Sequence, residues 1–159
     1  MISNNKKGFT LTELLLVVTI IAFLSAAAAI TYTTSRMKTR DGRRVSDIKQ
    51  MYTTMEIVAN TTPGVALEGC DGAYDLTSSC TGPALIINDM VKFYDPLGSV
   101  PCQPGVVAET CNYSISRSDG TAGATVDNFQ ICFLLEGNTI SYNAGLHSIN
   151  DQGVIAGCN

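Results

Sequence analysis

One stretch near the start of the chain decides how the rest is organised: Lys6-Lys7-Gly8-Phe9-Thr10-Leu11-Thr12-Glu13-Leu14-Leu15-Leu16-Val17-Val18. After this basic start, an almost wholly apolar segment runs from Phe9 to Ile30. As a helix that rises about 1.5 Å per residue, it spans roughly 33 Å, which is enough to cross the hydrocarbon core of a bilayer. An acid buried in such a segment costs on the order of 2–4 kcal/mol. The stretch therefore predicts a membrane-inserted helix in which Glu13 has a function.

The segment Gly8-Phe9-Thr10-Leu11-Thr12-Glu13-Leu14, with the apolar run behind it, resembles the prepilin processing motif of type IV pilins and type II secretion pseudopilins. In that family a membrane peptidase cuts after the glycine and methylates the new N-terminal residue. The resemblance implies that Gly8 ends the leader peptide, Phe9 is the mature N-terminus and Glu13 is the acidic assembly residue. The resemblance is strong over about residues 6–35 and fair to about residue 60. Beyond that point, only the architecture is similar.

The resemblance also implies a function. The chain would be the structural subunit (pilin) of a type IV pilus-like helical filament, a homo-oligomer built through the apolar helices. The precursor would be inserted in the cytoplasmic membrane, would meet prepilin peptidase and an inner-membrane assembly platform, and would end in an extracellular or periplasmic filament. A type II secretion pseudopilin is the alternative within the family. Motility, adhesion, DNA uptake and secretion stay open as roles of the filament.

An ordinary secretory signal peptide is the competing interpretation, because a basic start, an apolar core and small residues from Ser25 to Ala29 fit its pattern. Cleavage near Ala28 would then release a secreted or membrane-anchored enzyme or binding domain. An acid such as Glu13 is unfavourable at the edge of a signal's apolar core, and alanines are also good helix formers. The sequence favours the prepilin interpretation.

The helical pattern continues beyond the apolar segment and becomes amphipathic. Apolar residues recur at steps of three and four: Val45, Ile48, Tyr52, Met55 and Ala59. One helix over 9–59 would be roughly 75 Å long, and Asn60-Thr61-Thr62-Pro63-Gly64 would end it. The predicted organisation is a leader at 1–8, a membrane and filament-core half-helix at 9–35, an amphipathic half-helix at 36–60 and a globular domain at 61–159.

Alternating patterns after residue 110 predict the strands of the globular domain. We expect strands over 112–116 and 128–135, a hairpin turn at 136–138 leading into a strand over 139–142, and a last short strand over 153–155. A short helix is expected within 84–94. The predicted fold is α+β and type IV pilin-like: a long helix, its apolar half protruding, packed on a small antiparallel sheet of three or four strands.

The charges are segregated along the chain. Eight of the ten basic residues lie at or before Lys49, and the region after it holds two basic against eleven acidic residues. Nucleic acid is therefore an unfavourable partner for the globular domain. The basic collar from Arg36 to Lys49 has three interpretations: a solvated helix face, a contact for anionic lipid headgroups, or a partner for the acidic domain of a neighbouring subunit.

Six cysteines lie after the apolar segment: Cys70, Cys80, Cys102, Cys111, Cys132 and Cys158. Their even number and their lack of paired zinc-type spacings favour three disulfides in an oxidising compartment. Sequence-local pairs are favoured, Cys70–Cys80 and Cys102–Cys111, with Cys132–Cys158 joining a strand to the C-terminus. The positive-inside rule conflicts with this placement, because more basic residues follow the apolar segment than precede it. We give the cysteines more weight.

The sequence contains no catalytic motif, so the expected function is not that of an enzyme. The one histidine, His147, has no recognisable nucleophile motif beside it. No cofactor is expected. Some major pseudopilins hold Ca²⁺ in a C-terminal loop, and Asp127-Asn128 and Asn150-Asp151 offer oxygen ligands. Their spacing follows no calcium-loop pattern, so solvated turns are favoured over a Ca²⁺ site.

Overall fold

A computed structural model describes residues 8–83, 90–95, 97–105 and 110–159. The predicted leader, apart from Gly8, and most of the short helix expected within 84–94 lie outside the described residues. The chain forms two compact units, Met1–Met37 and Lys38–Asn159, and each is described by itself.

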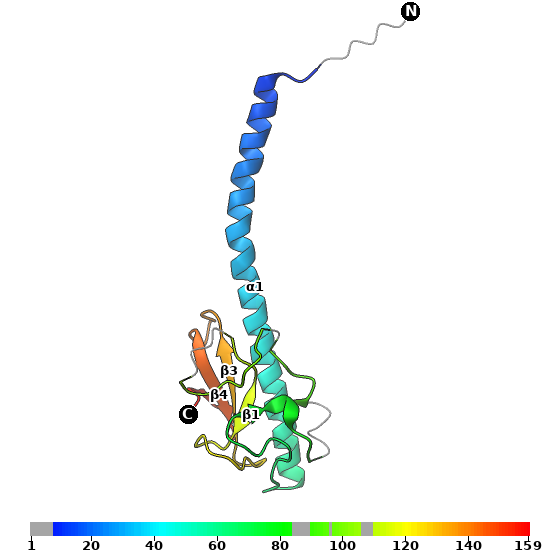
Figure 1. Cartoon of the computed structure of the whole chain (residues 1–159), viewed down its shortest axis with the longest axis vertical. Coiled ribbons are helices and arrows are strands. Elements are labelled where there is room, and N and C mark those ends of the chain that lie inside the picture. Colours follow the sequence, from blue (N-terminus) through cyan, green and yellow to red (C-terminus); the bar gives the residue numbers. More distant parts are fainter. Residues whose placement is uncertain (1–7, 84–89, 96, 106–109) are drawn as a thin grey trace, which may run out of the picture. The chain divides into compact units, whose positions relative to one another are not determined.

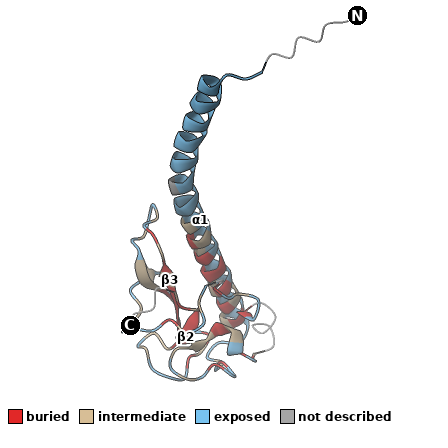
Figure 2. Ribbon diagram, turned by 45° about the horizontal axis from the view of Figure 1, so that its top comes forward, coloured by how far each residue is buried: buried red, intermediate tan, exposed pale blue. Residues whose placement is uncertain are grey.

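The first unit is the apolar part of helix α1, which spans Leu11–Thr61 and starts in the blue part of Figure 1. Every described residue from Gly8 to Ala29 is exposed (Figure 2). Its threonines donate to the helix backbone: Thr19 Oγ1 to Leu16 O at 2.8 Å, and Thr31 Oγ1 to Ala27 O at 3.2 Å. These hydroxyls therefore need no partner from lipid or from another helix. Within the described chain, α1 is long and apolar enough to cross a membrane.

The second unit packs the remainder of α1 on an antiparallel sheet. Its strands are β1 (Asp75–Leu76), β2 (Ser114–Ser116), β3 (Gln130–Leu135), β4 (Gly145–Asn150) and β5 (Ile155–Ala156), and they pair in chain order. A single 3₁₀ turn, Thr77–Ser79, follows β1. The long helix and the small antiparallel sheet confirm the predicted α+β class, with five strands where three or four were expected.

Two apolar layers flank β3, which alternates between them. Ile131, Phe133 and Leu135 join the core formed with α1, to which the helix contributes Ile48, Met51, Met55 and Val58. Cys132 and Leu134 point to the opposite face, where they pack with the Cys102–Cys111 disulfide. Because both faces of β3 are covered, its sequence is an apolar run and not a clean alternation of apolar and polar residues.

The predicted strand over 139–142 is wrong, because β4 begins only at Gly145. The residues between are held by local hydrogen bonds. Thr139 N–H donates to Tyr142 O at 2.8 Å, and Tyr142 N–H donates to Thr139 Oγ1 at 2.9 Å. Ala144 N–H donates to Asn138 Oδ1 at 2.7 Å. These bonds close a loop, so the alternating segment does not pair with β3.

Three disulfides hold the second unit: Cys70–Cys80, Cys102–Cys111 and Cys132–Cys158, with Cα–Cα distances of 4.7, 4.9 and 5.6 Å. They are the pairs that the sequence favours. Cys132 is central in the sheet and Cys158 lies at the C-terminus. The third disulfide therefore ties the last strands to the apolar layer on the face of β3 opposite the core formed with α1.

Removing the Cys132–Cys158 disulfide is expected to destabilise the domain more than removing Cys70–Cys80. The two bonds close loops of 26 and 10 residues. The chain-entropy model gives about 3.5 and about 2.7 kcal/mol for them. Urea unfolding of the Cys132→Ala/Cys158→Ala and Cys70→Ala/Cys80→Ala variants measures both. A larger loss for the Cys70–Cys80 pair would contradict the ranking.

Candidate functional site

The predicted cleavage site lies in a short segment without regular secondary structure before α1. Gly8, Phe9 and Thr10 are outside the helix and exposed. A Cβ atom built on Gly8 meets no atom within 4 Å, and the φ angle of Gly8 is not in the left-handed region. The described part of the chain therefore does not itself require glycine at this position. A requirement for glycine would come from an enzyme that binds the segment.

Glu13 and Thr10 form a capping box at the start of α1. Thr10 N–H donates to Glu13 Oε2 at 2.9 Å, and Thr10 Oγ1 donates to the same oxygen at 2.7 Å. In return, Glu13 N–H donates to Thr10 Oγ1 at 3.3 Å. Each residue thus satisfies a backbone donor that the helix leaves open. The negative charge also lies in the first turn, where the helix dipole favours it.

This local role of Glu13 was not among the predictions from the sequence, although its signal is present there. Thr10-Leu11-Thr12-Glu13 before an apolar run matches the capping-box signature. Glu13 is therefore a helix-capping residue before any neighbour is present. Substitution of Glu13 therefore changes both its charge and these hydrogen bonds, and the two effects need separate variants.

A second group of charged residues, the Arg44 cluster (Arg40, Asp41, Arg44, Asp95 and Glu136), lies inside the globular unit. Arg44 is fully buried. It donates from Nη1 to Asp41 Oδ1 at 2.8 Å and to Glu136 Oε1 at 2.6 Å, and from Nη2 to Asp95 Oδ1 at 3.0 Å. Its Nε also donates to Asp95 Oδ2. All of the Arg44 guanidinium nitrogens are thus bonded to carboxylates.

The cluster joins α1 to the loop after β3. Arg40 Nε donates to Glu136 Oε1 at 2.8 Å. The Asp41 carboxylate accepts from the backbone N–H groups of Glu136 at 3.0 Å and of Gly137 at 2.9 Å. The end of β3 is therefore attached to one turn of the helix by side-chain and backbone hydrogen bonds.

Burial and ion pairing oppose each other in the pKa values of the cluster. Burial on its own would lower the pKa of Arg44, but hydrogen bonds and attraction from Asp95, with Glu136 and Asp41, outweigh it and the pKa is raised. The hydrogen bond from Arg40 lowers the pKa of Glu136, and Arg44 adds to this effect. Arg44 therefore keeps its charge although it is buried.

Asp47 is a further buried acid on the same face of α1. Tyr113 Oη donates to Asp47 Oδ2 at 3.2 Å, and Arg43 Nε lies 3.6 Å from the same oxygen. Burial raises the pKa of Asp47 despite these two partners. Burial also raises the pKa of Tyr113, and the nearby Asp47 carboxylate adds to this rise. The Tyr113 hydroxyl therefore stays protonated and can donate.

The basic residues of 36–49 do not all have the same surroundings. Arg44 is buried and Arg40 is 31% exposed, and both are paired with acids of their own chain, so their charges are already balanced within the globular unit. Arg44 pairs with Asp41, three residues before it, and Arg43 lies near Asp47. Within the described parts of the chain, no ion pair involves Lys38 or Lys49. The available basic charge of the collar is therefore smaller than the sequence suggests.

The remaining candidate residues serve local structure. His147 lies in β4, where its Nε2 is 2.8 Å from Asn143 O and its ring is 5.8 Å from that of Phe133. Asn128 Oδ1 accepts from Ser118 Oγ at 2.6 Å. Asn150 Oδ1 accepts from the backbone N–H of Gln152 at 3.1 Å and of Val154 at 2.9 Å. Two of the oxygens considered for Ca²⁺ are thus used in hydrogen bonds within turns.

The comparison with known families concerns the N-terminal segment. Residues 3–29 match the family model for the prokaryotic N-terminal methylation motif, which is the prepilin motif of type IV pilins and pseudopilins. Gly8, Phe9 and the Thr10–Glu13 capping box all lie within the matched residues. No curated protein and no solved structure matches the chain. The chain thus carries the N-terminal segment of a type IV pilin-like or pseudopilin precursor, and its apolar helix fits a membrane-anchored precursor.

Proposed function

We propose that this chain is a structural subunit of a type IV pilus-like filament and not an enzyme. Prepilin peptidase would cut it after Gly8 and methylate Phe9, and an inner-membrane platform would then assemble it. The observation that carries the proposal is the match of residues 3–29 to the methylation motif, in continuity with a helix whose apolar side chains are exposed. A type II secretion pseudopilin would share the same processing and the same mode of assembly.

The exposed apolar helix gives the physical reason for assembly. Residues 8–29 show apolar side chains on all sides of the helix, and such a surface is not stable in water. The membrane would cover it in the precursor, and the helices of other subunits would cover it in the filament. The filament would then leave the membrane and be extracellular or periplasmic, with the globular units on its surface.

Glu13 would fix the position of each helix in this apolar bundle. Lipid tails and apolar side chains solvate a helix about equally well, so apolar contacts alone do not select one register. Cleavage would create a positive amine on Phe9, which lies four residues, about one turn, before Glu13. Attraction between the Phe9 amine of one subunit and Glu13 of the next would be strong where water is scarce. A single buried polar contact of this kind can select a register, as in coiled coils.

Gly8→Val is expected to block processing without changing the fold. A Cβ at Gly8 contacts nothing in the described chain, so the effect of valine would arise in the peptidase site. Electrophoresis and intact-mass analysis of membrane fractions from the native host should show only uncleaved precursor. Gly8→Ala, the smallest possible change, is the matched control and should retain more cleavage than Gly8→Val. Normal cleavage of Gly8→Val would contradict the proposed processing site.

A further inference from the structure

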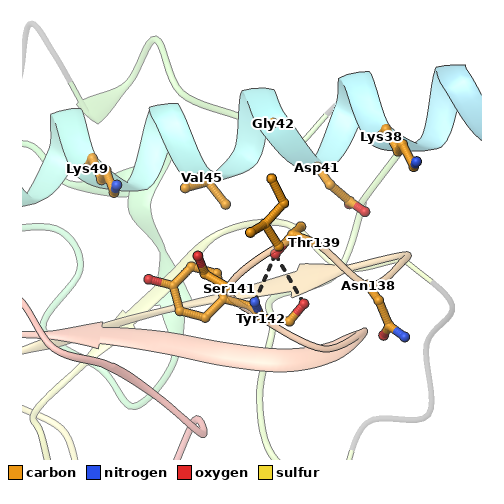
Figure 3. A pocket seen from close by; sticks show the side chains of 10 residues that line it. Lys38, Asp41, Gly42, Val45, Lys49, Asn138, Thr139, Ser141 and Tyr142 are labelled. Carbon is orange, nitrogen blue, oxygen red and sulfur yellow. Dashed lines mark hydrogen bonds between the residues drawn. The ribbon is translucent and has the colours of Figure 1, made fainter.

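An open groove of about 650 Å³ lies within the globular unit, between α1 and the loop that joins β3 to β4. We call it the β3–β4 groove. Figure 3 shows Lys38, Gly42, Val45 and Lys49 in a row along the helix, with the loop facing them. The hydrogen bonds between Thr139 and Tyr142 hold the loop in this shape, so the groove does not depend on a bound partner.

The groove combines apolar surface with positive charge. Ile140 on the loop is fully exposed, and Val45 on the helix is half-buried. Lys38 and Lys49 are eleven residues apart, close to three full turns, so they lie on one face of α1 at the two ends of the row (Figure 3). As shown above, neither lysine has an ion-pair partner in the described chain. A matching surface would be apolar at its centre and acidic around it.

Near the end of α1 the same chain carries two acids and two exposed apolar side chains, which we call the acidic end (Glu56, Ile57, Asp151 and Val154). Glu56 follows Tyr52 by four residues and so lies beside it on the helix surface, and the charges of Glu56 and Asp151 contribute to a raised pKa of Tyr52. The turn from β4 to β5 is adjacent, because a Cβ on Gly153 would lie 2.9 Å from the Tyr52 ring. Ile57 is 56% and Val154 is 52% exposed, which gives the acidic end an apolar component.

We propose that the β3–β4 groove is the docking site for the acidic end of a second copy of this chain. The inference rests on the proposed function and names one contact within the filament. The two surfaces differ, so the contact is heterologous and leaves one groove and one acidic end free at the two ends of any row of subunits. Repetition of such a contact gives an open helical assembly and not a closed dimer.

The spacing along α1 is consistent with this contact. Glu56 is seven residues after Lys49 and eighteen after Lys38, both close to whole numbers of turns, so the three residues share a face. At about 1.5 Å per residue, Glu56 is about 10 Å along the axis from Lys49 and about 27 Å from Lys38. For its Glu56 to lie opposite a lysine of the first copy, a second copy must be turned about its helix axis so that this face meets the first copy, and shifted along the axis by one of these distances.

Carbodiimide cross-linking of native filaments, followed by mass spectrometry, tests the contact. The reagent joins a lysine directly to a carboxylate, and Lys38, Lys49 and Lys92 are the lysines after Gly8. A link from Lys38 to Glu56 must join two subunits, because the two are about 27 Å apart along one helix. Filaments that mix two nitrogen isotopes make the same distinction for Lys49. We expect links from Lys38 or Lys49 to Glu56 or Asp151 in filaments and not in detergent-dispersed subunits.

Exchange of the charges provides an independent measurement. Lys49→Glu alone and Glu56→Lys alone should each lower the number of filaments at least about tenfold, because each places like charges opposite each other. The double variant restores attraction and should recover most of the filaments. Processing at the wild-type level in all three variants is the control.

The outcomes separate this contact from the proposed function. Intact wild-type filaments without these cross-links, and a double variant no better than the single ones, would overturn the docking site and leave the filament proposal in place. If lipid headgroups occupied the groove instead, the same result would be accompanied by weaker binding of the Lys49→Glu variant to membranes. Absence of filaments from the wild-type chain would overturn both proposals.

Discussion

Glu13→Ala is expected to give subunits that are processed and inserted in the membrane but form no filaments. The proposed contact between Glu13 and the Phe9 amine of a neighbour is the main polar contact available to select a register among apolar helices. Without it, a buried positive amine would lose its partner, and leaving a buried charge unpaired costs about 3–5 kcal/mol. Because this cost recurs at every subunit, even a part of it would prevent growth of a filament. Electron microscopy of a strain without a wild-type copy measures the result.

The capping box makes a sharper experiment possible. Glutamine can take the place of glutamate in a capping box, so Glu13→Gln keeps the hydrogen bonds with Thr10 and removes only the charge. Thr10→Val does the reverse, since it removes the hydroxyl partner and keeps the charge. A role in register predicts that Glu13→Gln fails like Glu13→Ala and that Thr10→Val still assembles. Abundant, ordered filaments from Glu13→Gln would show that Glu13 acts as a helix cap and not through its charge.

Arg44→Met is expected to destabilise the globular unit by about 3–5 kcal/mol, because it leaves buried carboxylates without their cation. Arg44 is fully buried and bonded to Asp41, Asp95 and Glu136. Methionine fills much of the volume but donates no hydrogen bond. The cluster also connects α1 to the end of β3, so its loss should loosen the loop that forms the β3–β4 groove. Urea unfolding of the detergent-solubilised full chain, followed by near-ultraviolet circular dichroism, measures the change.

The neighbouring arginine provides the matched control. The Arg43 side chain is 51% exposed and lies 3.6 Å from Asp47, so Arg43→Met should cost only about 0–1 kcal/mol. The two variants make the same chemical change at adjacent positions of one helix. Similar losses for Arg43→Met and Arg44→Met would contradict the structural role of the Arg44 cluster.

The features that depend on nearby residues were predictable from the sequence. The long helix follows from an apolar run that continues into an amphipathic pattern, and α1 is found within two residues of the expected ends. The Cys70–Cys80 and Cys102–Cys111 pairs join cysteines only ten and nine residues apart. Each of these inferences needs a short window of sequence and one physical rule.

The Arg44 cluster could not be predicted in this way. A search for apolar periodicity treats an arginine on a helix as exposed, and Arg44 lies on the buried face beside Ile48 and Met51. Two of its acidic partners, Asp95 and Glu136, are 51 and 92 residues away in the sequence. Only the folded arrangement of helix and sheet shows that these three charges meet.

The late start of β4 is a second feature that the sequence pattern did not predict. The segment over 139–142 alternates like a strand, but Thr139 and Tyr142 bond to each other and close a loop. Side-chain hydrogen bonds of this kind compete with strand pairing over a few residues. Periodicity does not detect them, and the exposed Ile140 of the β3–β4 groove arises from the same loop.

The intact mass of the native protein tests the central claim most directly. Purified from its own host, the protein should have the mass of a chain that begins at Phe9, with one added methyl group. Peptide fragmentation should place this group on the Phe9 amine, and reduction should reveal three disulfides. A chain that begins near Ala29 would contradict the account, because an ordinary signal peptidase would then have removed the whole apolar segment together with Glu13.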